Sequence, residues 1–324
     1  MTGDASRTGF IVLLPRRELL AADRVTANGK LAHWISRGDH LTDQPEGSDA
    51  MLSACFDVAG QRMPTAALTR ELDGMAPDDA VWLRADPAHV QADMVSARLL
   101  ACGDLGLSRA ESDEFLSALK PLFGDAGLRI EAGTPARWYV RCEGDVGLPE
   151  FAPPEAALGD DLRAHLPAGS AGGRWRSLLN EAQIVLHNHP LNAKRRAGGK
   201  TGVNSIWFWG GGRRPDWVRT HVAWAMSNDA LMRALALRAG IACDSSVGKF
   251  DELSRNEDAT GTRLLDLRRV SAEPLERGWL GPIDAVLRAR RIGRVDLLFA
   301  SGERYRVVPR HRWRWWRSIR LFDA

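Results

Sequence analysis

The stretch from His187 to Trp217 holds the side chains best suited to bind a ligand. It combines imidazoles, amides, basic residues, three tryptophans and the glycine run 210–212. Glycines let backbone come close to a ligand, and free N–H groups beside Arg213 and Arg214 suit an anion. A tight turn with solvated arginines would have the same sequence pattern, so an anion site and an ordinary turn are both possible interpretations. Neither the G-x-x-x-x-G-K-[ST] motif nor the G-x-G-x-x-G motif for nucleotides is present.

Two elements must position this stretch. The apolar spacing of Trp175–His187 predicts a helix, and Pro190 should end it, which places the next polar residues at the helix end and in a loop. The β-branched and aromatic run Asn204–Trp209 predicts a buried strand.

The order of the polar residues resembles a known family. The strings are HP-x-N-x-x-R and N-x-x-W-x-W-G-x-G-R, formed by His189, Pro190, Asn192, Arg195, Asn204, Trp207, Trp209, Gly210, Gly212 and Arg213. They are similar to the central signature of archaeal-type, cofactor-independent phosphoglycerate mutases. They resemble more closely the RpfE-type regulatory proteins, a bacterial offshoot of that family. Asp79–Asp86, Thr134–Arg141 and Pro153-Pro154 extend the resemblance, and Gly47-Ser48-Asp49 is a weaker echo.

The resemblance implies a fold, a domain plan and a site. The fold is α/β, with a degraded alkaline-phosphatase-superfamily core (1–77 and 218–324) and an inserted α+β substrate-binding subdomain (78–217). The implied ligand residues are Arg84, Asp86, Arg137, His189, Asn192, Arg195, Asn204, Trp207, Gly210, Gly212 and Arg213. We expect Arg84, Arg137, Arg195 and Arg213 to meet in one pocket, because arginine suits bidentate phosphate contact.

The departures from the family concern its metal site. Such mutases use two divalent ions to activate a serine, which requires a cluster of Asp and His ligands. Here Arg16-Arg17 follows the strand predicted at Phe10–Leu14, and no Asp-His pattern follows Val218. Ser48 is the weak candidate nucleophile, because a serine without metals or a base is poorly reactive; the alternative is an ordinary turn residue. We expect no metal and no cofactor.

Composition is ordinary for a globular chain. The chain has 324 residues, 44% hydrophobic and 26% charged, with a formal net charge of +3, too small to argue for nucleic acid alone. Its longest aliphatic run is too short for a membrane span. Four cysteines form no C-x-x-C pair, which favours reduced thiols in a cytoplasmic protein.

Further elements are predicted around this core. Ser108 and Glu111 should form a capping box that starts a helix at Arg109. Strands are expected at Leu128–Glu131 and Arg137–Cys142, and a hairpin at Val295–Phe299 and Arg304–Val308. A helix capped by Asn228 should end at Gly240.

The C-terminal stretch Arg310–Arg320 alternates arginine with tryptophan. Packing of Trp313, Trp315 and Trp316 into the domain, as a half-buried edge strand, is the favoured interpretation. Binding of nucleic acid, or of a membrane or protein surface, remains open.

Three functional hypotheses follow. The first is a pseudoenzyme with a regulatory or ligand-sensing role that keeps an anion pocket for phosphate or a small phosphorylated acid. The second is an active phosphomonoester mutase or phosphatase with a reduced metal set. The third is a nucleic-acid-associated regulator acting through the C-terminal segment.

Overall fold

The computed structural model describes residues 8–21, 29–60, 62–92, 96–143, 148–245, 250 and 261–317. The chain forms two compact units. Unit 1 combines residues 1–59 with residues 217–324, and unit 2 is the continuous segment 60–216. Unit 2 therefore also includes residues 60–77, which precede the boundary expected at 78. Together the units have the predicted mixed α/β character.

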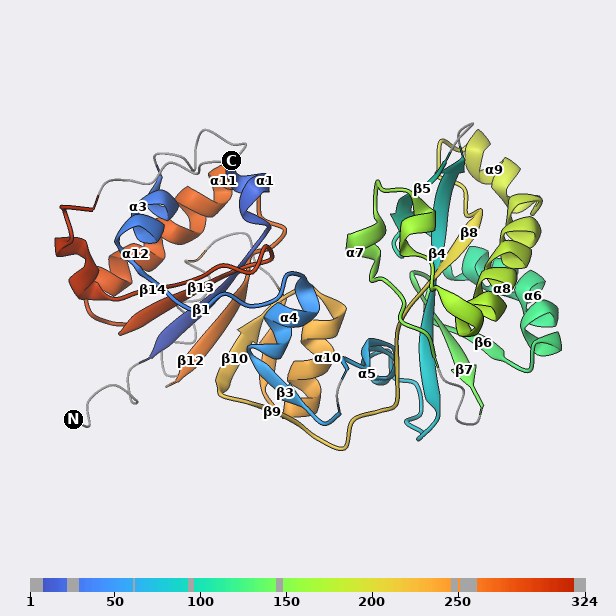
Figure 1. The fold of residues 1–324 in the computed structure, drawn as a ribbon, viewed down its shortest axis with the longest axis horizontal. Coiled ribbons are helices and arrows are strands. Elements are labelled where there is room, and N and C mark those ends of the chain that lie inside the picture. The colour runs from blue at the N-terminus through green and yellow to red at the C-terminus, as the bar shows by residue number, and fades with distance from the viewer. Residues whose placement is uncertain are drawn as a thin grey trace. The chain divides into compact units, whose positions relative to one another are not determined.

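Unit 1 is built on a seven-stranded sheet (Figure 1). In spatial order its strands are β11 (Ala242–Asp244), β10 (Val222–Met226), β12 (Thr262–Asp266), β1 (Gly9–Leu14), β13 (Arg294–Phe299), β14 (Arg304–Val307) and β2 (Asp39–His40). The first five run parallel to one another, β14 runs antiparallel to them, and β2, antiparallel to β14, again follows their direction. All six residues of β1 are buried, as expected for a parallel strand covered on both faces.

The helices of unit 1 are short. They are α1 (Arg17–Ala21), α3 (Lys30–Arg37), α4 (Ser48–Ser53), α10 (Ala230–Ala239), α11 (Ala272–Pro274), the π-helical turn η3 (Leu275–Leu280), α12 (Gly281–Arg288) and the 3-10 turn η4 (Pro309–Trp313). Helices α3 and α12 share one core with alternate residues of β1, including Val12. A separate ladder pairs β3 (Phe56–Val58) with β9 (Val218–Thr220).

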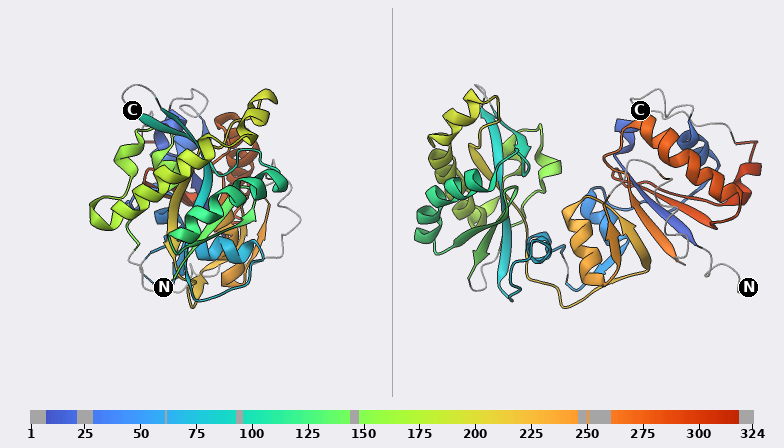
Figure 2. Two further views of the ribbon diagram at one scale, coloured as in Figure 1. Left: turned by 90° about the vertical axis from the view of Figure 1, so that its right-hand side faces the viewer. Right: turned by 180° about the vertical axis from the view of Figure 1, so that it is seen from behind.

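Unit 2 is α+β. Its antiparallel sheet contains β4 (Val81–Ala92), β5 (Ala97–Cys102), β6 (Arg129–Thr134), β7 (Arg137–Cys142) and β8 (Ser205–Gly212). The long strand β4 pairs with β8 along one edge, and with β7 and then β5 along the other. The helices are α5 (Thr65–Leu72), α6 (Arg109–Asp125), α7 (Pro154–Ala157), the 3-10 turn η1 (Leu162–His165), α8 (Gly169–His187) and α9 (Leu191–Ala197). Figure 2 shows the same elements from two further sides.

Most predicted elements are confirmed. The capping box at Ser108 is present, and the hairpin β13–β14 forms. Two helix predictions need correction. Asp229, not Asn228, caps α10, because its carboxylate accepts the N–H of Met232. Pro190 ends α8 but also stands at the start of α9, where a proline is tolerated because the first N–H groups have no helical partner.

The prediction for Arg310–Arg320 is wrong where the structure describes it; residues 318–320 lie outside the described residues. Residues 309–313 form the turn η4 rather than an edge strand, and Trp313, Trp315 and Trp316 are 64%, 78% and 66% exposed. Among the described residues, no helix is long and apolar enough to cross a bilayer.

Candidate functional sites

Strand alternation gives the unit 2 sheet two different faces. Val81, Leu83 and Ala85 of β4 join the core under α6 and α8. The residues between them point to the opposite face, where Trp82 packs with Ala66 of α5. We call that opposite face the polar face, because Arg84, Asp86, Arg137, Tyr139 and Trp209 lie on it.

Arg84 and Asp86 form a buried pair at the centre of the polar face. The guanidinium donates from Nε to Asp86 Oδ1 at 2.8 Å and from a terminal nitrogen to Oδ2 at 2.7 Å. The Trp209 indole N–H also donates to Asp86, at 2.8 Å. Burial raises the pKa of the Asp86 carboxyl, and Arg84 and Trp209 counteract that rise. The third Arg84 contact is Thr69 Oγ1 of α5 at 3.2 Å.

Arg137 is held by Asp73, the residue that directly follows α5 and caps its C-terminal end. Its Nε lies 3.0–3.1 Å from the two carboxylate oxygens, and the Tyr139 hydroxyl donates to the same carboxylate at 2.7 Å. The Arg137 side chain is 25% exposed, whereas the Asp73 side chain is 2% exposed. Burial raises the pKa of Tyr139, and its ring lies 5.4 Å from the Arg84 guanidinium. Arg84 and Arg137 therefore belong to one cluster, joined through Tyr139.

The predicted site residues around the α8–α9 junction form hydrogen bonds with nearby backbone groups. Asn192 donates to the carbonyls of Leu186 and Val203 and accepts the Val203 N–H, all at 2.7–2.8 Å. His189 accepts the N–H of Leu191 and packs on Phe115. Asn192 lies on α9, not in a loop as predicted, because α9 starts directly after Pro190.

Arg195 is buried beside α6. Its guanidinium donates to the Thr201 carbonyl at 2.9 Å, to Glu111 at 2.8 Å and to the Leu105 carbonyl at 2.7 Å. Only 2% of the residue is exposed. Like Asn192, it is on α9 and not in the predicted loop.

The predicted residues of β8 are also held by neighbouring backbone. Asn204, just before β8, exchanges two hydrogen bonds with Val90, at 2.7 and 2.8 Å, and the Trp207 indole donates to the Ala152 carbonyl. Arg213 is exposed and donates to the Asp79 carbonyl at 2.6 Å.

The glycine run lies within β8 rather than after it. A Cβ at Gly210 would lie 2.8 Å from Thr65 Cβ, and one at Gly212 would lie 2.7 Å from Pro64 Cβ. The close approach that these glycines permit is to the start of α5. The space beside these glycines is therefore filled by the protein itself and not by a ligand. The predicted strand ended three residues too early, because glycine weakens a strand pattern.

The structure thus brings two of the four predicted arginines together. Arg84 and Arg137 share the polar face, whereas Arg195 contacts α6 and Arg213 contacts Asp79, two residues before β4. Sequence reasoning missed Thr69 and Asp73, which reach the cluster from α5 and carry no local signal. Tyr139 was findable, because it alternates with Arg137 and Arg141 along β7.

The second candidate site is the edge of the unit 1 sheet where its parallel strands end, the usual ligand position in α/β sheets. Asp266, at the end of β12, accepts two hydrogen bonds from Arg268 at 2.8 and 2.7 Å and one from the Ser227 hydroxyl at 2.6 Å. Asp229 lies 3.7 Å from the same guanidinium. Burial opposes ionisation of Asp266, but Arg268 and Ser227 outweigh it and lower the pKa of its carboxyl.

Ser48 opens α4 near the same edge. The N–H of Gly47, with φ 103°, donates to the Ala300 carbonyl just after β13. Nearby, Arg16 pairs with Glu46 at 2.7 Å, and Arg17 lies 3.5 Å from Glu303. The carboxylates of Glu46 and Glu303 near this strand end are therefore paired with arginines.

The residues here do not fit a pair of divalent ions. Within the described part of the chain, no three His, Cys, Asp or Glu side chains are grouped as a metal site requires. A carboxylate bonded bidentately to arginine offers few lone pairs to a cation. Asp39, an N-terminal carboxylate, is paired with Arg314 at 2.6 Å, which with His311 lowers the pKa of its carboxyl.

Comparisons with known proteins place the chain near one enzyme group. No family model matches it. It is 26% identical over 301 residues to the 2,3-bisphosphoglycerate-independent phosphoglycerate mutase of Methanosarcina barkeri, covering 87% of this chain and 73% of that protein. The corresponding protein of Methanosarcina mazei is 27% identical over 313 residues, covering 89% and 77%. A probable enzyme of the same name from Geobacter sulfurreducens is 31% identical over 156 residues, but that match spans only 38% of its length and 48% of this chain.

Two solved structures show a weaker likeness. The cofactor-independent phosphoglycerate mutase of Thermoplasma acidophilum aligns with a TM-score of 0.44 and 15% identity, over 93% of this chain and 90% of that one. A Pyrococcus horikoshii protein aligns with a TM-score of 0.48 and 13% identity, over 93% and 87%. The proteins to which this chain is similar by sequence carry the name 2,3-bisphosphoglycerate-independent phosphoglycerate mutase.

Proposed function

We propose that this protein is a non-catalytic relative of phosphoglycerate mutases that binds a small phosphorylated acid and acts in regulation, as the RpfE-type resemblance suggests. The observation that carries the proposal is the Arg268–Asp266 pair at the end of β12. A guanidinium supplies the positive charge there, and it repels a divalent ion that would otherwise activate a nucleophile. Among the described residues, Ser48 has no metal cluster that would activate it.

The polar face of unit 2 is the proposed ligand site. Arg137 is the accessible member of the cluster, since a quarter of its side chain is exposed. An incoming phosphate or carboxylate would replace the Asp73 carboxylate as the partner of Arg137. It would also accept the hydrogen bond that the Tyr139 hydroxyl now donates to Asp73. Because Asp73 ends α5, the exchange would release the end of that helix. Binding would thus be coupled to a local structural change, as sensing requires.

The test combines turnover with binding. Purified protein is assayed for conversion of 3-phosphoglycerate with Mn²⁺ present, and binding of 3-phosphoglycerate is measured by calorimetry. We expect binding without turnover, a loss of binding in Arg137→Ala, and no loss in Arg129→Ala, whose side chain on β6 is 73% exposed. Metal-dependent turnover would support the active-mutase alternative instead. Absence of binding would refute the ligand proposal.

A further inference from the structure

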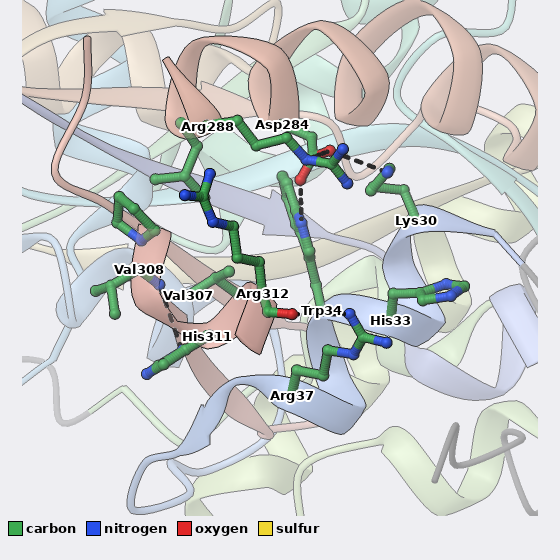
Figure 3. Close-up of a pocket in the computed structure, with 12 residues that line it drawn as sticks. Lys30, His33, Trp34, Arg37, Asp284, Arg288, Val307, Val308, His311 and Arg312 are labelled. Atoms are coloured by element: carbon green, nitrogen blue, oxygen red, sulfur yellow. Dashed lines mark hydrogen bonds and ion pairs between the residues drawn. The ribbon is translucent and has the colours of Figure 1, made fainter. Parts of the chain in front are cut away.

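Unit 1 contains a small basic pocket of about 60 Å³ between α3, α12 and η4 (Figure 3). Its cationic lining consists of Lys30, Arg37, Arg288 and Arg312, with His33 beside them. Asp284 is the one acidic side chain among its described lining residues. The pocket therefore has an excess of positive charge, which favours an anionic ligand.

The pocket wall is rigidly built around Asp284. Its carboxylate accepts the Trp34 indole N–H at 3.1 Å and pairs with Lys30 at 2.9 Å and Arg288 at 2.8 Å. Glu276 of η3 fixes the start of α3 by accepting the backbone N–H groups of Lys30 and Leu31 at 2.7 and 3.1 Å. Within the pocket lining, one carboxylate thus orients two cations. Figure 3 shows Asp284 with Trp34, Lys30 and Arg288.

The aromatic segment, residues 313–316, lies next to this pocket and is anchored by its arginine. Arg314 donates to the Arg37 carbonyl at 3.0 Å and to Asp39 at 2.6 Å. The neighbouring residue Arg317 donates to the Gly38 carbonyl, and the Arg312 carbonyl accepts from Arg37 at 3.2 Å. Charged side chains hold the segment to the body, so its tryptophans are the residues left facing solvent.

Three such tryptophans within four residues form an exposed apolar patch. At 64–78% exposure they gain little from folding, and a patch of this kind rimmed by polar groups usually marks an interaction surface. Arg312 joins patch and pocket, because it lines the pocket and its guanidinium lies 4.7 Å from the Trp313 ring. One ligand can therefore contact both.

We propose that this surface binds single-stranded nucleic acid, with phosphates in the basic pocket and bases stacked on Trp313, Trp315 and Trp316. Positive grooves beside aromatic platforms are how proteins bind single strands without sequence preference. The recess favours a flexible polyanion, whose phosphates can enter it, over a flat anionic bilayer. The site is separate from the polar face of unit 2, so either proposal can fail without the other.

The test uses the full chain and a fluorescent oligothymidylate of about 15 nucleotides, a length within the usual site sizes. Binding is followed by anisotropy and by quenching of tryptophan fluorescence. We expect affinity to fall steeply as salt is raised, because phosphate contacts release counterions. The triple variant Trp313→Ala, Trp315→Ala, Trp316→Ala should weaken binding by tenfold or more, and Arg312→Ala should reduce both affinity and salt dependence.

Two matched controls separate specific from general effects. Trp217→Ala removes a tryptophan of unit 1 that is 41% exposed, and Arg277→Ala removes an arginine whose side chain is 81% exposed; both should bind like the parent. The proposal is overturned by no binding at low salt, or by binding that the triple variant leaves intact. Sedimentation with anionic phosphatidylserine vesicles, without oligonucleotide binding, would also overturn it and assign the surface to membranes.

Discussion

At the residue scale, the Arg268–Asp266 pair has the largest expected effect on stability. Asp266 has a side chain only 9% exposed, so Arg268→Ala leaves a buried carboxylate without its counter-charge. Removing one partner of a buried pair costs about 3–5 kcal/mol. Urea denaturation of the whole protein should show this loss, whereas Arg277→Ala, which removes an exposed pair, should change the free energy of unfolding by less than about 1 kcal/mol. Equal small losses would mean that the pair is solvated.

The same pair predicts a pH dependence. Because the pKa of the Asp266 carboxyl in the folded protein lies below its ordinary 3.8, its ionised form stabilises the fold above that value. The contribution is lost as pH falls from the ordinary pKa through the lowered one. Asp266→Asn should therefore lose less stability than the parent protein between pH 5 and about pH 3. Parallel stability curves for the two proteins would contradict the assignment.

At the element scale, α6 and α9 are joined through one arginine. Glu111 both completes the α6 capping box and accepts Arg195 at 2.8 Å, and together these contacts lower the pKa of its carboxyl. Arg195→Ala should thus destabilise unit 2 by about 2–4 kcal/mol, since three acceptors, among them the buried Leu105 carbonyl, lose their donor. A ligand-binding role alone would leave the unliganded variant as stable as the parent. Chemical denaturation without ligand distinguishes the two, with Arg196→Ala, an exposed neighbour on α9, as the control.

For the aromatic segment, unlike for Arg195, we expect substitutions to have little effect on stability. Substituting its three tryptophans by alanine should change the free energy of unfolding by less than about 0.5 kcal/mol each, because exposed side chains contribute little to folding. Arg314→Ala should cost more, because Arg314 anchors the segment to Asp39. A loss of several kcal/mol in the triple variant would restore the packed interpretation.

The elements themselves were largely predictable, and their contacts were not. Apolar patterning identified α8 by the spacing of its buried face, and β1 and β13 by short continuous apolar runs. It failed at Arg310–Arg317, where alternation of arginine and tryptophan reflects arginines that bind backbone carbonyls rather than a buried strand face. The Arg84–Asp86 pair and the Arg195 contacts depend on tertiary neighbours such as Thr69 and Glu111, which no local pattern reveals.

At the scale of the whole molecule, the chain folds as two units with separate cores. The resemblance predicted an inserted segment that starts at 78, whereas unit 2 starts at 60; α5 carries none of the matching motifs. Helix α5 belongs there since Thr69 and Asp73 complete the polar face. Two cores of this kind favour unfolding in more than one step, so a single midpoint is not a sufficient measure of stability.

The two proposed ligands should therefore act on different units. A ligand at 100 times its dissociation constant stabilises the state it binds by about 2.7 kcal/mol. We expect 3-phosphoglycerate to slow amide hydrogen exchange in peptides covering α5 and β7, and the oligothymidylate to slow it in peptides covering α3 and residues 309–317. The reason is that each set of contacts lies wholly within one unit. Protection of α5 and β7 by the oligonucleotide, or of α3 by phosphoglycerate, would show that one of the sites is assigned to the wrong unit.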